Sequence, residues 1–133
     1  MGRRGAHGGR SRGHGRGRRR RRVLQFLQPC LLLLLQSGEA HGYALLDELE
    51  RFGFDRERVD PTLVYRALRE MEEAGWIQSS WDEESQGPRR RVYTLHKEGK
   101  RQLTLWIEDL RKTQSEIEHL LREYKDQEDV HDT

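Results

Sequence analysis

The chain has 133 residues, of which 33% are hydrophobic and 36% are charged, so it can build a small core and at most one modest domain with tails. Ten of the 25 Lys and Arg residues, all of them arginines, lie in residues 1–22, which contain no acidic residue, whereas residues 23–133 have a formal charge of −8. This division excludes bulk positive charge as the basis of nucleic-acid binding by the folded part, which would need local clusters of basic residues.

The low-complexity Gly/Arg-rich segment at residues 1–22 predicts a disordered basic arm. Two interpretations stay open: an electrostatic arm that contacts DNA phosphates, or a solubilising tail. The apolar run Val23–Leu35 that follows could also be the core of a secretory signal. Against this, the basic region is long, Gln25 and Pro29 interrupt the run, and no small-x-small cleavage site follows. The run is also too short to span a membrane.

We interpret the apolar run as a buried helix over residues 23–36 that ends at Gly38. Because nearly every face is apolar from Cys30 onward, it needs cover from its own domain or from a second subunit. A single cysteine excludes an internal disulfide and favours a reducing cytosol. Cys30 is read as a small apolar residue, although a redox-sensing thiol stays open. A second helix carries an apolar stripe formed by Leu45, Leu46, Leu49 and Phe52, and it ends at Gly53.

A third helix is predicted over residues 60–75. Asp60 is suited to the N-cap, Pro61 to the first helical position and Gly75 to the C-terminal left-handed position. One face is a core face, formed by Val64, Ala67, Leu68, Met71 and Ala74. The opposite face presents a hydroxyl, an aromatic ring and two guanidinium groups, from Thr62, Tyr65, Arg66 and Arg69. Such a face is typical of a helix that reads a DNA groove, and a solvated amphipathic helix is the alternative.

After Gly75 the pattern predicts two short strands, over residues 76–82 and 89–95, joined by a turn at Gly87 and Pro88. Three arginines stand at the start of the returning strand: Arg89, Arg90 and Arg91. This hairpin, directly after a helix that could read DNA, indicates a wing. The alternative is an edge strand on which charge blocks aggregation.

A long helix is predicted over residues 96–125. Its apolar positions alternate by three and four residues over three heptads, which is typical of a coiled-coil seam. About 30 residues at 1.5 Å each make a rod of roughly 45 Å, longer than a small domain covers. The seam is therefore expected to pair with a second chain, with packing inside one subunit as the alternative. The acidic residues 126–133 are expected to fray.

Three segments together resemble the PadR family of bacterial transcriptional regulators, and more narrowly its short subfamily with a single C-terminal helix. They are HGYALLDEL at 41–49, VYRALREMEEAGWI at 64–77 and GPRRRVYTLHKEG at 87–99. The resemblance covers residues 27–110. It implies a dimeric winged-helix protein whose C-terminal helix packs against the partner's N-terminal helix. Many such proteins are repressors released by a phenolic or drug-like effector, or by another signal.

The resemblance also carries residue roles. Tyr65 matches a recognition-helix tyrosine that lies at the DNA backbone, and Gly42 and Tyr43 match the signature that opens the second helix. Gly75, Gly87, Arg90 and Tyr93 match the turn and wing pattern. Two departures stand out. Leu63 and Val64 replace a small or hydroxylated residue followed by Leu, so that Thr62 would supply the hydroxyl. His96 replaces the usual Thr before the long helix.

The predicted fold is therefore mainly α with a small β-hairpin: a winged helix-turn-helix plus a long C-terminal dimerisation helix. The predicted segments are a basic arm (1–22), a DNA-binding domain (23–95), the dimerisation helix (96–125) and an acidic tail (126–133). The predicted DNA-binding residues are Tyr43, Thr62, Tyr65, Arg66, Arg69, Arg89, Arg90 and Arg91. The predicted dimer interface comprises Leu31, Leu34, Leu103, Trp106, Leu110, Ile117, Leu120, Leu121 and Tyr124, with Trp106 also considered for an effector pocket.

We expect a homodimeric repressor of the bacterial cytoplasm, associated with the nucleoid, that binds double-stranded DNA at a pseudo-palindromic operator and is released by an effector. The alternative is a winged-helix protein-interaction module without specific duplex binding. No catalytic arrangement of Ser, His and Asp, no phosphate loop and no metal-ligand spacing is recognised, and His41, His96 and His119 lack partners at telling spacings. We therefore expect no enzyme activity, no metal, no cofactor and no membrane partner.

Overall fold

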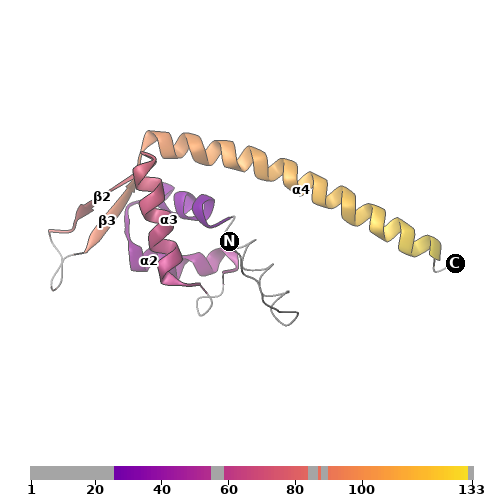
Figure 1. The fold of residues 1–133 in the computed structure, drawn as a ribbon, viewed down its shortest axis with the longest axis horizontal. Coiled ribbons are helices and arrows are strands. Elements are labelled where there is room, and N and C mark those ends of the chain that lie inside the picture. The colour runs from indigo at the N-terminus through magenta and orange to yellow at the C-terminus, as the bar shows by residue number, and fades with distance from the viewer. Residues whose placement is uncertain (1–25, 55–58, 84–86, 88–89, 132–133) are drawn as a thin grey trace, which may run out of the picture.

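The computed structural model describes residues 26–54, 59–83, 87 and 90–131. The predicted basic arm and Arg89 lie outside these residues. In chain order, the elements are a helix over residues 26–36, β1 (Ala40–His41), α2 (Gly42–Glu48), the 3-10 helix η2 (Leu49–Phe52), α3 (Pro61–Glu73), β2 (Ile77–Trp81), β3 (Arg91–Leu95) and α4 (Lys97–His131). A mainly helical body thus carries a small hairpin on one side and sends out one long helix on the other (Figure 1). This arrangement confirms the predicted winged helix-turn-helix with a long C-terminal helix.

The boundaries of α3 arise from the local signals in its sequence. Asp60 is extended, and its carboxylate accepts a hydrogen bond of 2.9 Å from the backbone N–H of Thr62. Pro61 occupies the first turn, and Gly75 has a φ of +84°, a left-handed conformation that glycine adopts at little cost. The buried face contains Val64, Ala67, Leu68 and Met71, as predicted. Ala74, also predicted for this face, is exposed, because it is the C-cap at the end of the helix.

The core is formed mainly by the first helix, α2 and α3, and Ile77 and Leu103 close it from β2 and α4. Leu31 is 0% exposed, and Leu34 and Leu103 are also buried within the single chain. These three residues are therefore covered within one protomer, and the dimer interface predicted for them stays a prediction. The apolar first helix obtains its cover from its own protomer, which was one of the two possibilities that its sequence left open. Phe26 and Leu33 are the large apolar side chains that this helix exposes within the described residues.

The three strands form an antiparallel sheet in the order β1-β3-β2. Tyr93 lies opposite Ser79 on one side and Ala40 on the other. β1 is not predictable from the sequence, because two residues are too few to show an alternating pattern. β1 matters for the site, since it leads directly into α2 and so joins the start of that helix to the hairpin.

Helix α4 leaves the body at the turn between α3 and β2. The backbone N–H of His96 donates to the carbonyl of Trp76 at 2.9 Å. Gly99, in the first turn of α4, lies so close to that carbonyl that a β-carbon would collide with it. The start of α4 is therefore tied to the end of the α3 segment through Trp76.

The 35 residues of α4 correspond to a rod of about 52 Å, most of which extends beyond the other described elements (Figure 1). Only Gly99 and Leu103 in it are buried. The helix reaches His131 rather than ending near Lys125, so residues 126–131 are helical and not frayed. No Gly or Pro follows Gly99 to stop it, and Tyr124 donates from its hydroxyl to Glu128 one turn later, at 2.6 Å.

Candidate nucleic-acid interface

The outward face of α3 is the one predicted to read DNA. Thr62, Tyr65, Arg66 and Arg69 are all exposed on it. Neither Arg66 nor Arg69 has a hydrogen bond or ion pair with any residue in the part of the chain that the structure describes. Their guanidinium groups therefore keep their donors available for another molecule.

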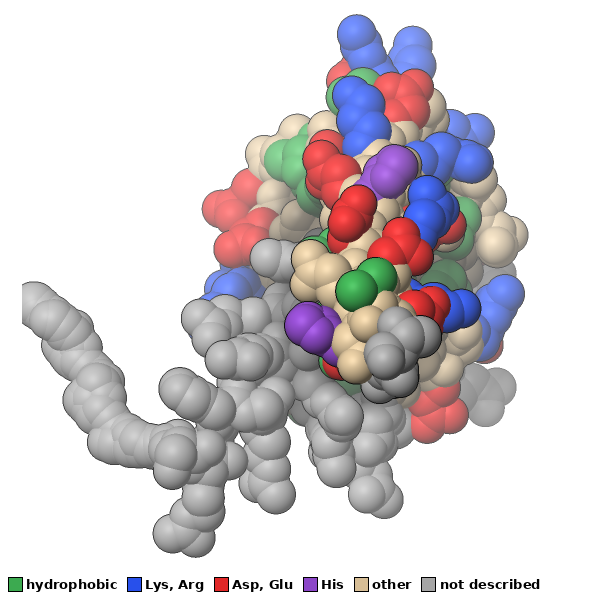
Figure 2. Space-filling view, turned by 90° about the vertical axis from the view of Figure 1, so that its right-hand side faces the viewer, with side chains coloured by type: hydrophobic (Ala, Val, Ile, Leu, Met, Phe, Trp, Pro, Cys, Tyr) green, Lys and Arg blue, Asp and Glu red, His purple; other side chains and the backbone are tan. Residues whose placement is uncertain are grey.

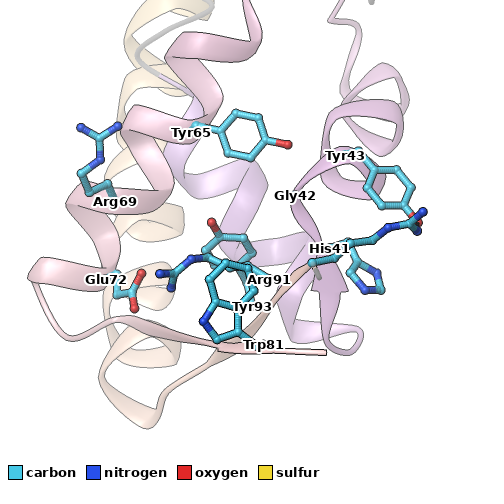
Figure 3. Close-up of a pocket in the computed structure, with 10 residues that line it drawn as sticks. His41, Gly42, Tyr43, Tyr65, Arg69, Glu72, Trp81, Arg91 and Tyr93 are labelled. Carbon is cyan, nitrogen blue, oxygen red and sulfur yellow. Dashed lines mark hydrogen bonds between the residues drawn. The ribbon is translucent and has the colours of Figure 1, made fainter. Parts of the chain in front are cut away.

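A groove of about 650 Å³ opens between α3 and the wing, on the same side as these residues (Figure 3). Its walls come from three parts of the chain that the sequence analysis treated separately: the start of α2, the face of α3 and the hairpin. The lining residues are His41, Gly42, Tyr43, Tyr65, Arg69, Glu72, Trp81, Arg90, Arg91 and Tyr93. The fold thus brings together five of the eight predicted DNA-binding residues, namely Tyr43, Tyr65, Arg69, Arg90 and Arg91. Thr62 and Arg66 lie outside the lining, and Arg89 is outside the described residues.

The groove takes its shape partly from Gly42. The hydroxyl of Tyr65 points toward Gly42 in Figure 3, and a β-carbon at residue 42 would lie 2.6 Å from Cε1 of Tyr65. Real β-carbons do not approach other atoms that closely, so any larger residue would displace the Tyr65 ring. The glycine therefore allows α2 and the recognition-helix tyrosine to lie against each other.

Arg90 connects the wing to the start of α2. Its Nη1 donates to the hydroxyl of Tyr43 at 2.7 Å, and the guanidinium carbon lies 5.0 Å from the centre of the Tyr43 ring. The other neighbour of that ring is His41, stacked at 5.5 Å, and His41 Nε2 lies 3.0 Å from Oδ2 of Asp82. Sequence reasoning missed the role of His41 because its partner is 41 residues away along the chain.

Arg91 is held by the hairpin itself. Its Nη1 donates to Oγ of Ser79 at 2.6 Å, and its guanidinium lies over the ring of Trp81. The Ser79 hydroxyl in turn donates to Glu72 on α3 at 2.8 Å. Ser79, Trp81 and Glu72 were not predicted as site residues. The alternation of β2 could have indicated that Ser79 and Trp81 share a face, although it could not have indicated which face looks onto α3.

Tyr93 is almost fully buried at the groove, opposite Ser79 in the sheet. Burial raises the pKa of its phenol, an effect that nearby Arg91 partly offsets. The Tyr93 phenol therefore stays neutral at physiological pH and remains a hydrogen-bond donor.

The predicted interface residues of α4 divide into two groups. Trp106 is partly buried against the core and Leu110 is of intermediate exposure, whereas Ile117, Leu120, Leu121 and Tyr124 are exposed. Trp106 meets Trp76 edge to face, with ring centres 5.4 Å apart, and it does not line the groove. An effector pocket at Trp106 stays a prediction.

Cys30 is half-buried, and burial raises the pKa of its thiol to about 11. Its reactive thiolate form is therefore scarce at neutral pH. Across residues 26–54, 59–83, 87 and 90–131, no cluster of three or more His, Cys, Asp or Glu side chains could hold a metal ion. None of the helices in these ranges is both long enough and apolar enough to cross a membrane.

A helix with exposed arginines, followed by a wing from which Arg90 and Arg91 line the same groove, is typical of winged-helix transcriptional regulators. The chain belongs to the PadR-like family of transcriptional regulators, whose family model matches residues 31–105. No functionally curated protein matches the sequence.

Solved structures of such regulators have the same fold. A PadR family regulator from Clostridium difficile is 26% identical with a TM-score of 0.61, and the match covers 72% of this chain and 98% of that chain. A PadR-like regulator from Bacillus cereus is 25% identical with a TM-score of 0.64, covering 74% and 94%. PadR from Bacillus subtilis, solved in complex with operator DNA, is 23% identical with a TM-score of 0.55, covering 63% of this chain and 48% of that chain. The last similarity shows the fold alone.

Proposed function

We propose that this PadR-like regulator is a homodimeric repressor that binds a pseudo-palindromic operator. The observation that carries the proposal is the position of Arg66 and Arg69. They lie exposed on α3 without a hydrogen bond or ion pair inside the described structure, beside a groove that two wing arginines also line. PadR from Bacillus subtilis, which has the same fold, was solved in complex with operator DNA, and this supports DNA as the ligand.

In this proposal α3 enters the major groove. Arg66 and Arg69 contact base edges or nearby phosphates, because guanidinium groups pair with guanine and with phosphate through two donors. Thr62 and Tyr65 contact the backbone and fix the register. Arg90 and Arg91, together with Arg89, contact phosphates or the minor groove beside it. The basic arm adds non-specific affinity, and the acidic body disfavours other orientations on DNA.

The second protomer is proposed because α4 exposes an apolar stripe that no residue in the described part of the chain buries. Ile117, Leu120, Leu121 and Tyr124 are each at least 50% exposed. In Figure 2, where the C-terminal end of α4 faces the viewer, acidic and basic side chains are interspersed. The surface of this helix that would pair with a second protomer is therefore the apolar stripe and not a patch of one charge. Two recognition helices in such a dimer would contact half-sites about one helical turn apart, roughly 34 Å.

Release by an effector is the remaining part of the proposal. Trp106 lies on the same helix, about three turns before the exposed stripe. It contacts Trp76, which is tied to the start of α4 and the end of α3. A molecule bound there would act on the junction between the dimer helix and the DNA-reading helix. The protein would work in the cytoplasm, on the nucleoid.

A winged-helix protein-interaction module is the second candidate, favoured by the formal charge of −8 on residues 23–133. A gel-shift experiment on the DNA upstream of the protein's own gene, at moderate salt and with excess non-specific competitor, separates the two. A repressor gives a shifted band that survives the competitor. Loss of the band in competitor would favour the interaction module.

A further inference from the structure

We propose that Tyr43 positions Arg90 to bind a DNA phosphate, as part of a ring of contacts that closes the base of the wing. We call Asp82, His41, Tyr43 and Arg90 the wing clasp. The proposal rests on the proposed DNA binding and deepens it. It assigns Tyr43 a role that runs through another residue, in place of an independent contact with DNA.

The wing clasp is a closed circuit of described contacts. Arg90 donates to the Tyr43 hydroxyl at 2.7 Å, Tyr43 stacks on His41 at 5.5 Å, and His41 reaches Asp82 at 3.0 Å. The circuit closes through the backbone, where the N–H of Asp82 donates to the carbonyl of Arg90 at 2.7 Å. Asp82 directly follows strand β2, and Arg90 directly precedes strand β3. His41 belongs to β1 and Tyr43 to α2. Both strands of the wing are therefore connected to the start of α2, one through Asp82 and the other through Arg90.

These contacts contribute more to orientation than to stability. The Tyr43 side chain is 47% exposed, and exposed hydrogen bonds and ion pairs stabilise a fold only slightly. These contacts restrict the rotamers of Arg90 before DNA binds. Less side-chain entropy is then lost on binding than for a freely rotating arginine. Among the described residues, one hydrogen bond and one ring contact hold the Arg90 guanidinium at the edge of the groove, and its other N–H donors have no described partner.

Arg90 differs from Arg66, Arg69 and Arg91 in the parts of the chain that its contacts connect. Arg91 is held by Ser79 and Trp81 of its own hairpin, so it does not set how the wing meets α2. Arg66 and Arg69 have no hydrogen bond within the described residues. Arg90 alone of the four bridges the wing and the helix-turn-helix. A guanidinium held in place in this way suits a phosphate, which it can bind through two parallel donors.

The test compares Tyr43→Phe, Arg90→Ala and the double variant by the salt dependence of their affinity for the duplex upstream of the gene. Tyr43→Phe keeps the ring and removes the hydroxyl that accepts from Arg90. Each phosphate contact contributes about 0.9 to the log–log slope, so Arg90→Ala should lower the slope by about 0.9 per bound protomer. Tyr43→Phe should also lower the slope, and the slope of the double variant should equal that of Arg90→Ala. Arg101→Ala, which removes the same charge from α4 outside the groove, should leave the slope unchanged.

A wild-type slope in Tyr43→Phe, or effects that add in the double variant, would overturn the positioning role, because residues that act through one another are not additive. A second measurement is independent of DNA. In the free protein, Tyr43→Phe and His41→Phe should speed hydrogen exchange of the Asp82 amide, whose bond to Arg90 closes the clasp. Unchanged exchange in both variants overturns the clasp even when the wild type binds its duplex. Faster exchange in a protein that binds no duplex overturns the proposed function and the phosphate role, while the clasp stands.

Discussion

The ring of Tyr65 occupies the space that a β-carbon at Gly42 would need. Such a β-carbon would lie 2.6 Å from Cε1 of the tyrosine and 3.0 Å from its hydroxyl oxygen. Gly42 does not have a left-handed φ, so its backbone conformation would accept another residue. The requirement for glycine is therefore steric, and it comes from α3 rather than from α2.

Gly42→Ala is expected to weaken DNA binding more than it weakens the fold. The colliding atoms are the far end of an exposed side chain, which can rotate away, so unfolding free energy should change by less than about 1 kcal/mol. Rotation removes Tyr65 from the groove and with it a hydrogen bond to a charged phosphate, a loss of about 1.5–3 kcal/mol. Thermal unfolding and fluorescence anisotropy on a duplex measure the two effects.

The control for this prediction is the same substitution in a Tyr65→Ala background. Without the ring there is nothing to displace, so Gly42→Ala should then have no further effect on affinity. An equal loss of affinity in both backgrounds would show that Gly42 acts by some route other than Tyr65.

Much of the fold could be predicted because its signals are local. Asp60, Pro61 and Gly75 act within one turn of the helix they bound, and both predicted hairpin strands occur within two residues of the expected positions. The groove could not be predicted in this way. Its contacts join Tyr43 to Arg90 across 47 residues, and they depend on β1, which is too short to leave a pattern.

The proposed dimer interface illustrates a second limit of what a periodic apolar pattern can predict. A run of apolar residues at heptad spacing looks the same whether its own subunit or another covers it. Leu103 is the first member of the seam and is buried in its own protomer, whereas Leu120 is 68% exposed. The point along α4 at which its apolar residues stop being buried by their own protomer depends on how far the rest of the domain extends along the helix. This is a property of the tertiary structure and leaves no local signal in the sequence.

Arg66→Ala and Arg69→Ala should each weaken binding to the operator duplex, by about 1–3 kcal/mol where a bidentate contact to a base is lost. Both side chains are exposed, so unfolding should be unaffected. Titrations of a specific and a scrambled duplex separate a base contact, which loses discrimination, from a phosphate contact, which weakens both. Retention of full operator affinity by both variants would contradict the assignment of α3 as the recognition helix.

A double substitution of Leu120→Glu and Leu121→Glu should convert the dimer to a monomer. Both side chains are more than half exposed in one chain, so the protomer should keep its fold. Burying two carboxylates against a second helix is unfavourable, which removes the reason to pair. Sedimentation equilibrium measures the mass. Arg122→Glu introduces the same side chain off the seam and should stay dimeric, and a dimer that survives the double substitution would place the interface elsewhere.

Deletion of residues 1–22 tests the basic arm and leaves every described residue in the chain. The segment carries ten arginines and no acidic residue. If it contacts phosphates, its loss should make the salt dependence of binding shallower, by about 0.9 in the log–log slope for each contact. Discrimination between specific and scrambled duplexes should be retained, because the arm carries no base readout. A slope equal to that of the full chain would show that the arm does not take part in binding.

Cys30 should react slowly with iodoacetamide in the native protein. Burial raises the pKa of its thiol from 9.0 to about 11, so the thiolate fraction at pH 8 falls roughly 100-fold relative to the unfolded chain. The raised pKa means that the folded state keeps this proton longer, so the contribution of Cys30 to the stability is constant below about pH 9 and falls as the pH rises toward 11. Mass spectrometry of alkylation, with and without denaturant, checks the rate. Native and denatured rates that agree at pH 8 would show a thiol accessible enough to sense oxidants, contrary to its packing beside the core.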